Sequence, residues 1–336
     1  MSRTVLLLSH AALHARDRLA PLEEAGFELV ERFDLDGTGD EDALAAALDG
    51  VWATVAGSER YSRFVLARSP SLRAIARCGV GYDAVDVPAA TDHGVAVLTT
   101  PGANADAVAD LALTLMLACL RRLLVVDATA RRGGWRPKQL ARDLTSATVG
   151  IVGLGAIGRA VARRVHGFGC RILAVEPAPD LEFCASYGVE LCTLADLLPE
   201  VDVLTLHVPL VPETRHLIGA RELARVKPTA IVVNTCRGGA VNEDALVAAL
   251  RDGRLAGAGL DVFEQEPLTP SNPLTTMEQV VLSGHAATFT ELAVANTIDA
   301  VVLNLLELAA SGTPPRGCVN PSVAEEGAGA AAEAAR

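Results

Sequence analysis

The chain has few aromatic residues. They make up only 4% of its 336 residues, although half of all residues are hydrophobic. The core must therefore be built mainly from Ala, Val and Leu, and this composition suits helices packed on a parallel sheet. A length of 336 residues is enough for two domains of ordinary size.

Clusters of basic residues are also lacking, and the formal net charge is −12. Nucleic acids and anionic membrane surfaces are bound largely through clustered Lys and Arg side chains. We therefore predict neither a nucleic-acid partner nor a membrane partner. A small anionic substrate remains compatible with this charge, because one or two local Arg residues are enough to bind it.

Cysteine pairs at metal-site spacing are absent. The seven Cys are scattered, their number is odd, and no C-x-x-C occurs. This pattern suits a reducing cytoplasm and argues against a disulfide framework or a zinc site. We predict a cytoplasmic protein without a metal site. The first apolar run is too short for a signal peptide, and the longest, residues 111–120, is too short to span a bilayer.

A glycine-rich turn follows the apolar segment 149–152. Gly153, Gly155 and Gly158 have G-x-G-x-x-G spacing and precede a helix-like segment from residue 159 to 167. In dinucleotide sites, the first glycine makes the tight turn and the second lets the backbone approach the pyrophosphate. The third lets the helix pack closely on the strand. We predict that Gly153, Gly155, Ala156, Ile157 and Gly158 hold a dinucleotide, with its phosphates at the helix N-terminus.

The next apolar strand ends in Glu176, about 20 residues past the turn, where a ribose-binding carboxylate belongs. A carboxylate can accept hydrogen bonds from the ribose hydroxyls and would repel the 2′-phosphate of NADP. An NADP site would need an Arg nearby, but residues 177–180 are Pro, Ala, Pro and Asp. We therefore expect NAD(H) in preference to NADP(H).

Strand-like and helix-like segments alternate along most of the chain. We predict strands at 4–9, 27–33, 52–56, 74–78 and 95–99, and then at 149–153, 172–175, 203–206, 230–234, 257–261 and 280–283. Helices are predicted at 11–25, 42–48, 104–132 and 291–310. Repeated βα units imply parallel sheets. The last helix follows the completed second sheet, so we expect it to return to the first domain.

These patterns predict an α/β fold with two doubly wound parallel-sheet domains. A Rossmann nucleotide-binding domain, residues 101–288, is inserted in a flavodoxin-like substrate domain, residues 1–100 plus 289–322. Residues 323–336 are mostly Ala, Gly and Glu, a composition that predicts a disordered tail.

Three side chains that could bind a carboxylate or transfer a proton come shortly after successive predicted strands: Arg237, Glu266 and His285. In an open α/β sheet, ligands bind beyond the carboxyl ends of the strands. An arginine there can hold a carboxylate bidentately and polarise an adjacent carbonyl. A histidine paired with a glutamate can give its proton to a keto oxygen as hydride reaches the carbon.

Together, these segments resemble the D-isomer-specific 2-hydroxyacid dehydrogenases. The motifs that carry the resemblance are 77–83, 100–104, 153–158, 207–214, 234–238, 259–267 and His285. The resemblance extends from about residue 50 to about residue 320 and implies two α/β domains that close over the substrate. It implies an NAD-dependent oxidoreductase that interconverts a small 2-keto acid and its D-2-hydroxy acid, as glyoxylate, hydroxypyruvate and phosphoglycerate enzymes do.

The resemblance also assigns roles. Arg237 would bind the substrate's carboxylate and keto oxygen, His285 would be the acid–base residue, and Glu266 would pair with it. The N–H groups of Val80 and Gly81 would help to hold the carboxylate. Residues implied to contact the cofactor are His207, Val208, Pro209, Thr214, Thr235, Cys236, Asp261, which would hold the nicotinamide carboxamide, His285 and Ala287. The long helix from Asn104 would lie at a homodimer interface.

The chain departs from the family pattern at three positions. Gly284 stands before the histidine where Pro is usual, Glu176 replaces the commoner Asp, and Cys236 replaces Ala or Ser. None of these changes removes a catalytic group.

The substrate's tail is harder to predict. A phosphorylated tail would need extra cations, for which Arg60, Arg77, Arg136 and Lys138 are candidates. Residues 57–59 are Gly, Ser and Glu, where phosphoglycerate-type members would have a phosphate-binding Arg. We therefore favour glyoxylate, hydroxypyruvate or another small 2-keto acid over 3-phosphoglycerate. Formate dehydrogenases of the same family pair their histidine with Gln, whereas this chain has Glu266. The sequence therefore disfavours a formate dehydrogenase.

A binding protein is the alternative from another class. Residues 285–287 and 317–320 resemble the C-terminal-binding-protein corepressors, which share the Arg, Glu and His but act chiefly as NAD(H)-dependent, partner-binding oligomers. Turnover separates the two hypotheses, because a sensor would bind NADH tightly and reduce 2-keto acids poorly.

Overall fold

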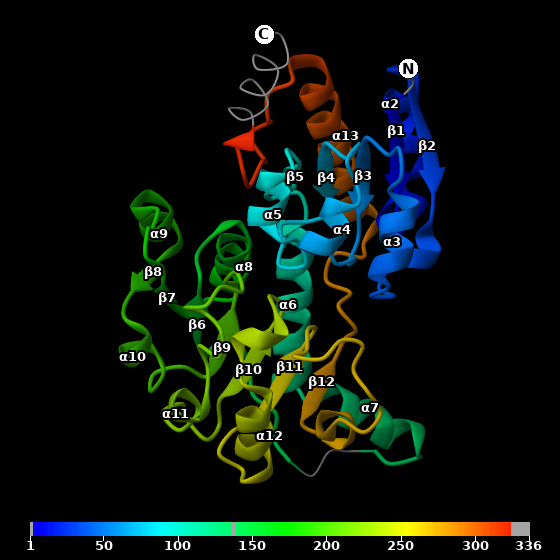
Figure 1. Cartoon of the computed structure of the whole chain (residues 1–336). Coiled ribbons are helices and arrows are strands. Elements are labelled where there is room, and N and C mark those ends of the chain that lie inside the picture. Colours follow the sequence, from blue (N-terminus) through cyan, green and yellow to red (C-terminus); the bar gives the residue numbers. More distant parts are fainter. Residues whose placement is uncertain (1–2, 136–138, 324–336) are drawn as a thin grey trace. The chain divides into compact units, whose positions relative to one another are not determined.

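The structure is a computed structural model that describes residues 3–135 and 139–323 (Figure 1). Val323, the first residue of the predicted tail, is buried in the first unit. Residues 324–336 of that tail and the candidate cations Arg136 and Lys138 lie outside the described residues. The chain divides into two compact units, one formed by the residues up to Asn104 and from Phe289 onward, the other by Ala105–Thr288. Each contains a parallel sheet, so the predicted α/β class with two such domains is confirmed.

The first unit contains a five-stranded sheet in the order β2-β1-β3-β4-β5. This is the flavodoxin-like order. The strands are β1 (Arg3–Leu7), β2 (Phe27–Glu31), β3 (Ala53–Ala56), β4 (Ala74–Arg77) and β5 (Ala96–Leu98). The remaining elements are α1 (His10–His14), η1 (Arg16–Leu19), α2 (Ala20–Glu24), η2 (Phe33–Leu35), α3 (Glu41–Ala47), α4 (Arg63–Ala67), α5 (Val87–Asp92) and α13 (Glu291–Ser311).

Helix α13 completes this unit from the far end of the sequence. Its buried residues recur every three or four positions, including Val294, Ile298, Val301 and Leu305, and they join the cluster that covers β1, β3 and β4. Of the described helices, α13 is the one whose length and composition would allow a membrane span. Half of its apolar stretch is nevertheless buried within the structure. This burial is typical of a core helix.

The single helix predicted at 11–25 is wrong. That segment forms α1, η1 and α2, with a break at Ala15 (φ −124°, ψ 41°). Pro21 lies in the first turn of α2, where its missing N–H costs nothing, but in the interior of one long helix it would remove a hydrogen bond. The breaks let Leu19 and Leu22 turn into the core.

The second unit has a seven-stranded sheet in the order β12-β11-β10-β9-β6-β7-β8. Its strands are β6 (Thr148–Val152), β7 (Arg171–Val175), β8 (Val189–Leu191), β9 (Val203–Leu206), β10 (Ile231–Asn234), β11 (Gly257–Leu260) and β12 (Val280–Leu282). The helices are α6 (Ala105–Leu120), α7 (Leu123–Arg131), α8 (Ala156–Gly167), α9 (Leu181–Tyr187), α10 (Leu194–Leu197), α11 (Ala220–Leu223), η3 (Gly238–Ala240), α12 (Glu243–Arg251) and η4 (Pro273–Thr276).

Two predictions for this unit need correction. The predicted count of six strands missed β8, an edge strand of only three residues that carries no clear strand pattern. The helix predicted at 104–132 is divided into α6 and α7, because Arg122 adopts the left-handed conformation (φ 50°, ψ 42°) and ends the first helix.

Candidate active site

The glycine-rich turn joins β6 to α8. Gly153 has φ 91°, and a Cβ there would lie 2.4 Å from the His207 carbonyl oxygen. A Cβ at Gly158 would lie 2.0 Å from the Gly153 carbonyl oxygen. Both positions therefore require glycine for the turn and for close helix–strand packing. A Cβ at Gly155 would meet nothing within 4 Å, so the N-terminus of α8 is open to a ligand.

Glu176, just after β7, lies beside this turn. Its Oε2 accepts the Leu154 N–H at 2.7 Å, and its Oε1 accepts the Ala178 N–H at 3.1 Å. These bonds fix the carboxylate next to the phosphate-binding turn. Each oxygen retains a lone pair that a ribose hydroxyl could use.

Two buried polar atoms lack partners just beyond β9 and β10. They are His207 Nδ1 and Thr235 Oγ1, neither of which has a hydrogen-bond partner among the described residues. The other ring nitrogen of His207 is 2.9 Å from the Thr205 hydroxyl, and burial lowers the pKa of His207 to about 3, so the ring is neutral. Because buried polar atoms are nearly always paired, these two atoms fit the polar groups of a dinucleotide.

Other implied cofactor residues already have internal bonds. The Thr214 hydroxyl accepts the Val211 N–H at 2.9 Å and donates to the Pro209 carbonyl at 2.5 Å, closing the loop that carries Val208. The buried Cys236 thiol donates to Asn234 Oδ1 at 3.1 Å. Burial raises the pKa of Cys236, so this thiol stays protonated.

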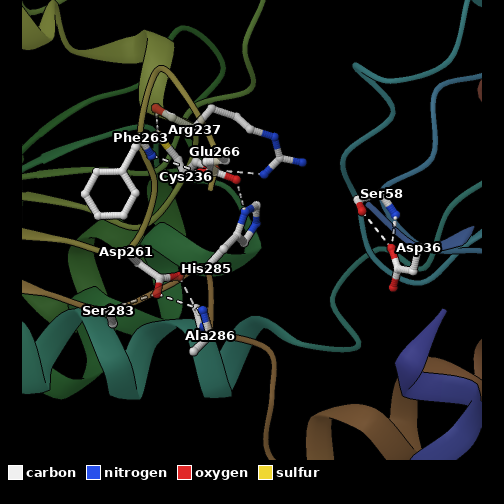
Figure 2. Close-up of polar contacts among 11 residues, drawn as sticks. Asp36, Ser58, Cys236, Arg237, Asp261, Phe263, Glu266, Ser283, His285 and Ala286 are labelled. Atoms are coloured by element: carbon white, nitrogen blue, oxygen red, sulfur yellow. Dashed lines mark hydrogen bonds and ion pairs between the residues drawn. The ribbon is translucent and has the colours of Figure 1, made fainter. Parts of the chain in front are cut away.

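Asp261 anchors the loop that carries the histidine. It is fully buried, and its carboxylate accepts the Ser283 hydroxyl at 2.7 Å and the N–H groups of Ala286 at 2.8 Å and Ala287 at 3.1 Å (Figure 2). The Asp261 carbonyl also accepts the His285 N–H at 2.7 Å. No sequence motif predicts this anchoring role of Asp261 and Ser283, because it depends on the fold.

His285 and Glu266 form a close pair. His285 Nδ1 is 2.7 Å from Glu266 Oε2, and Glu266 Oε1 accepts the Phe263 N–H at 2.9 Å. The hydrogen bond to Glu266 raises the pKa of His285, and this effect outweighs its partial burial. Burial alone would raise the pKa of Glu266, but the bonds from His285 and Phe263 outweigh it and lower that pKa. The pair therefore favours a charged imidazolium whose Nε2 is left for a substrate.

Arg237 lies beyond the carboxyl end of β10, and Figure 2 shows its side chain close to those of Glu266 and His285. One guanidinium nitrogen donates to the Cys236 carbonyl at 2.7 Å. Its positive charge further lowers the pKa of Glu266 and limits the rise in the pKa of His285. A Cβ at Gly238 would lie 1.9 Å from the Phe263 backbone, so glycine lets the loops after β10 and β11 pack together.

Val80 and Gly81 lie in the first unit, in the turn after β4. Gly79 has φ 147°, and its carbonyl accepts the Thr100 N–H at 3.0 Å. The Gly81 carbonyl accepts Arg77 Nε–H at 3.1 Å. In the described part of the chain, the N–H groups of Val80 and Gly81 donate to no acceptor. Two free, successive N–H groups can bind an anion.

The remaining candidate cations have other contacts. Arg60 is largely exposed and lies 3.6 Å from Glu41, while Arg77 bonds to backbone carbonyls. Within residues 3–135 and 139–323, no group of His, Cys, Asp and Glu is arranged to hold a metal ion. All seven cysteines are free thiols.

Residues 113–287 match the model of the D-isomer specific 2-hydroxyacid dehydrogenase NAD binding domain. The chain belongs to this family. A glyoxylate reductase of Korarchaeum cryptofilum is 44% identical over 256 residues, which are 75% of this dehydrogenase and 77% of that protein. The D-3-phosphoglycerate dehydrogenase of Methanocaldococcus jannaschii is 38% identical over 85% of this chain, which spans only 54% of that relative.

Solved structures agree with this assignment. A glyoxylate reductase from Paecilomyes thermophila is 33% identical, with a TM-score of 0.84 over 95% of this dehydrogenase and 98% of that chain. An NADPH-dependent glyoxylate/hydroxypyruvate reductase from Sinorhizobium meliloti, in complex with NADP and malonate, is 31% identical, with a TM-score of 0.82 over 96% and 98% of the two chains. The dehydrogenase is therefore an NAD(P)-dependent oxidoreductase that interconverts a 2-keto acid and a 2-hydroxy acid.

Proposed function

We propose that this dehydrogenase reduces a small 2-keto acid, glyoxylate or hydroxypyruvate, with NADH in the cytoplasm, and that it acts as a homodimer. The observation that carries the proposal is the 2.7 Å pair of His285 and Glu266 with Arg237 beside it. This arrangement combines a proton donor with a carboxylate-binding cation.

The proposed mechanism divides the work among three side chains. Arg237 binds the substrate's carboxylate and polarises its keto oxygen. His285 donates its Nε2 proton to that oxygen, and Glu266 keeps the imidazole oriented and charged until the transfer. The bound nicotinamide cofactor supplies the hydride. In the reverse direction, neutral His285 accepts the hydroxyl proton.

The proposed cofactor site combines the open end of α8 with the ends of β7, β9, β10 and β11. Its residues are Gly153, Gly155, Ala156, Ile157, Gly158, Glu176, His207, Val208, Pro209, Thr214, Thr235, Cys236, Asp261, His285 and Ala287. The unpartnered His207 Nδ1 and Thr235 Oγ1 support this assignment. We propose NAD(H) over NADP(H) because the Glu176 carboxylate lies beside the turn and would repel a 2′-phosphate.

Glu176→Ala tests this preference. The variant should weaken NADH binding and leave NADPH binding less affected. Only the ribose of NADH has a free 2′-hydroxyl that can donate a hydrogen bond to the carboxylate. Fluorescence titration of both cofactors measures the two Kd values. Equal weakening would contradict the ribose assignment.

The proposed homodimer is supported by helix α7. This helix has no buried residue, and its Leu123 and Leu124 side chains are 55% and 50% exposed. Apolar surface of this kind commonly marks an interface.

The proposed reaction is tested by following oxidation of NADH, with NADPH in parallel, against glyoxylate, hydroxypyruvate, pyruvate and 3-phosphohydroxypyruvate. We expect fast turnover of glyoxylate or hydroxypyruvate with NADH. Preference for the phosphorylated acid would instead identify a phosphoglycerate-type enzyme. Tight NADH binding without turnover of any member would support the corepressor-like alternative.

A further inference from the structure

We propose that Arg77 is a positioning residue that fixes the carboxylate-binding turn, residues 79–81, by tying it to the loop after β3. This inference rests on the proposed function, because it takes the N–H groups of Val80 and Gly81 as the site of the substrate's carboxylate. All the residues involved belong to the first unit.

Arg77 is the last residue of β4 and bonds to two backbone carbonyls. Its Nε donates to the Gly81 oxygen at 3.1 Å, and its Nη1 donates to the Gly57 oxygen. A guanidinium is planar and presents its donors in fixed directions. One side chain can therefore hold two carbonyl groups at a set separation and angle, which a flexible lysine cannot do as well.

Arg77 thus forms a bridge from Gly81 to Gly57. The loop that carries Gly57 is itself fixed by hydrogen bonds. Glu59, only 3% exposed, accepts the Gly57 N–H at 2.8 Å. Asp36 Oδ1 accepts the Ser58 N–H at 3.1 Å and the Ser58 hydroxyl at 2.6 Å (Figure 2). A Cβ at Gly57 would lie 2.7 Å from Asp36 Oδ1, so the loop packs tightly on that carboxylate. The Gly57 carbonyl therefore has a fixed position, and Arg77 can orient the turn relative to it.

The bridge explains how the turn presents its N–H groups. The Gly79 carbonyl is held by the Thr100 N–H, and the Gly81 carbonyl is held by Arg77. With the carbonyls at both ends fixed, the N–H groups of Val80 and Gly81 remain available for an anion. Without Arg77, the Gly81–Tyr82 peptide could rotate, and the neighbouring Gly81 N–H would lose its fixed direction.

This role differs from direct contact with a substrate tail, for which Arg77 is a candidate from its charge alone. All 2-keto acids share the carboxylate but differ in the tail. A positioning residue should therefore affect every substrate by a similar factor, whereas a tail-binding residue should affect only substrates with a polar tail.

The test uses Arg77→Ala and Arg77→Lys, with Arg73→Ala as the matched control. Arg73 precedes the same strand and also bonds to two backbone carbonyls, those of Pro70 at 2.9 Å and Leu72 at 2.8 Å. For each protein we would measure kcat and KM for glyoxylate, pyruvate and hydroxypyruvate, the binding of oxamate in the presence of NADH, the Kd of NADH, and Tm. Oxamate reports on the carboxylate site without turnover.

Arg77→Ala should raise KM for all three acids, and the Kd of oxamate, by a common factor of about 10 to 100, the size expected when a binding group is misplaced by about 1 Å. Arg77→Lys should show a smaller uniform loss. The Kd of NADH should not change, and Arg73→Ala should change KM by less than about threefold, as surface substitutions usually do.

A loss confined to hydroxypyruvate would overturn the proposal in favour of direct tail contact. Losses no larger than those of Arg73→Ala would overturn it as well. If Arg77→Ala fails to fold, Arg77→Lys decides by the same criterion of uniform loss. If the unaltered enzyme reduces no 2-keto acid, the proposed function fails, but oxamate binding still tests the role of Arg77.

Discussion

At the scale of single residues, the proposed chemistry depends on the bond between His285 and Glu266. The imidazole is oriented by a carboxylate that is itself held by the Phe263 N–H. The ring nitrogen that would meet the substrate is thereby given a fixed direction and a proton. Two substitutions test the two roles separately: one removes the proton donor, and the other removes the carboxylate that raises its pKa.

His285→Ala should lower kcat for reduction by about two to four powers of ten, the usual contribution of a general acid. NADH affinity should change much less, because His285 is only one of many residues of the proposed cofactor site and the glycine-rich turn is unaltered. His93→Ala, at an exposed position after α5, is the control. A loss below about threefold would remove His285 from the mechanism, since it is far below any general-acid contribution.

Glu266→Gln should change the pH dependence. In the proposed mechanism, reduction requires protonated His285, so it should be fastest below the pKa of His285 and fall as the pH rises through it. Glu266 raises that pKa, so its neutralisation should move the fall in kcat/KM for reduction to lower pH. Oxidation requires neutral His285, and its rise should move in the same direction. Identical profiles for the two proteins would contradict a titrating pair.

At the scale of elements, the β6–turn–α8 unit depends on two glycines whose missing side chains let backbone approach backbone. Gly158→Ala should destabilise the protein by about 1–3 kcal/mol through overpacking, because the new Cβ would lie 2.0 Å from the Gly153 oxygen. NADH binding should weaken as the turn is displaced. Thermal unfolding and NADH titration measure the two effects.

Gly167→Ala is the matched control for this change. Gly167 ends the same helix, and a Cβ there would meet nothing within 4 Å. Alanine in a helix is favoured over glycine by about 1 kcal/mol, so this variant should be as stable as the unaltered protein or more so. Equal destabilisation by both variants would show that the clash at Gly158 is not the cause.

The elements also show what the sequence could predict. Apolar runs of four or five residues located most of the strands, and the rule for strand ends brought Arg237, Glu266 and His285 to one edge of a sheet. The short edge strand β8 has too few residues for a pattern. The break at Arg122 depends on one residue's backbone conformation, which its side chain does not reveal.

Backbone contacts explain most of what the sequence did not predict in the site. Asp261 holds backbone N–H groups more than 20 positions further along the chain. The bridge from Gly57 through Arg77 to Gly81 ends on two carbonyl oxygens. Every residue type has the carbonyl and all but proline have the N–H, so the backbone partners of such bonds leave no trace in a motif.

At the scale of the whole molecule, the exposed face of α7 predicts self-association. Leu124→Asp should weaken the proposed homodimer, because a charge would be buried against apolar surface. Size-exclusion chromatography with light scattering would show a shift towards monomer. Leu181→Asp, at a leucine on α9 that is 68% exposed, should leave the mass unchanged. A monomeric unaltered protein would contradict the homodimer.

The late position of α13 in the sequence has a consequence for biosynthesis. Strands β1 to β5 leave the ribosome more than 180 residues before α13, whose side chains cover one face of their sheet. At about 5–20 residues per second, this interval is on the order of 10–40 seconds. The inserted unit, Ala105–Thr288, can fold during that time, whereas the first sheet must wait with the α13-covered part of its apolar face exposed. A nascent chain stalled before residue 291 should therefore bind chaperones through the apolar side chains of strands β1 to β5.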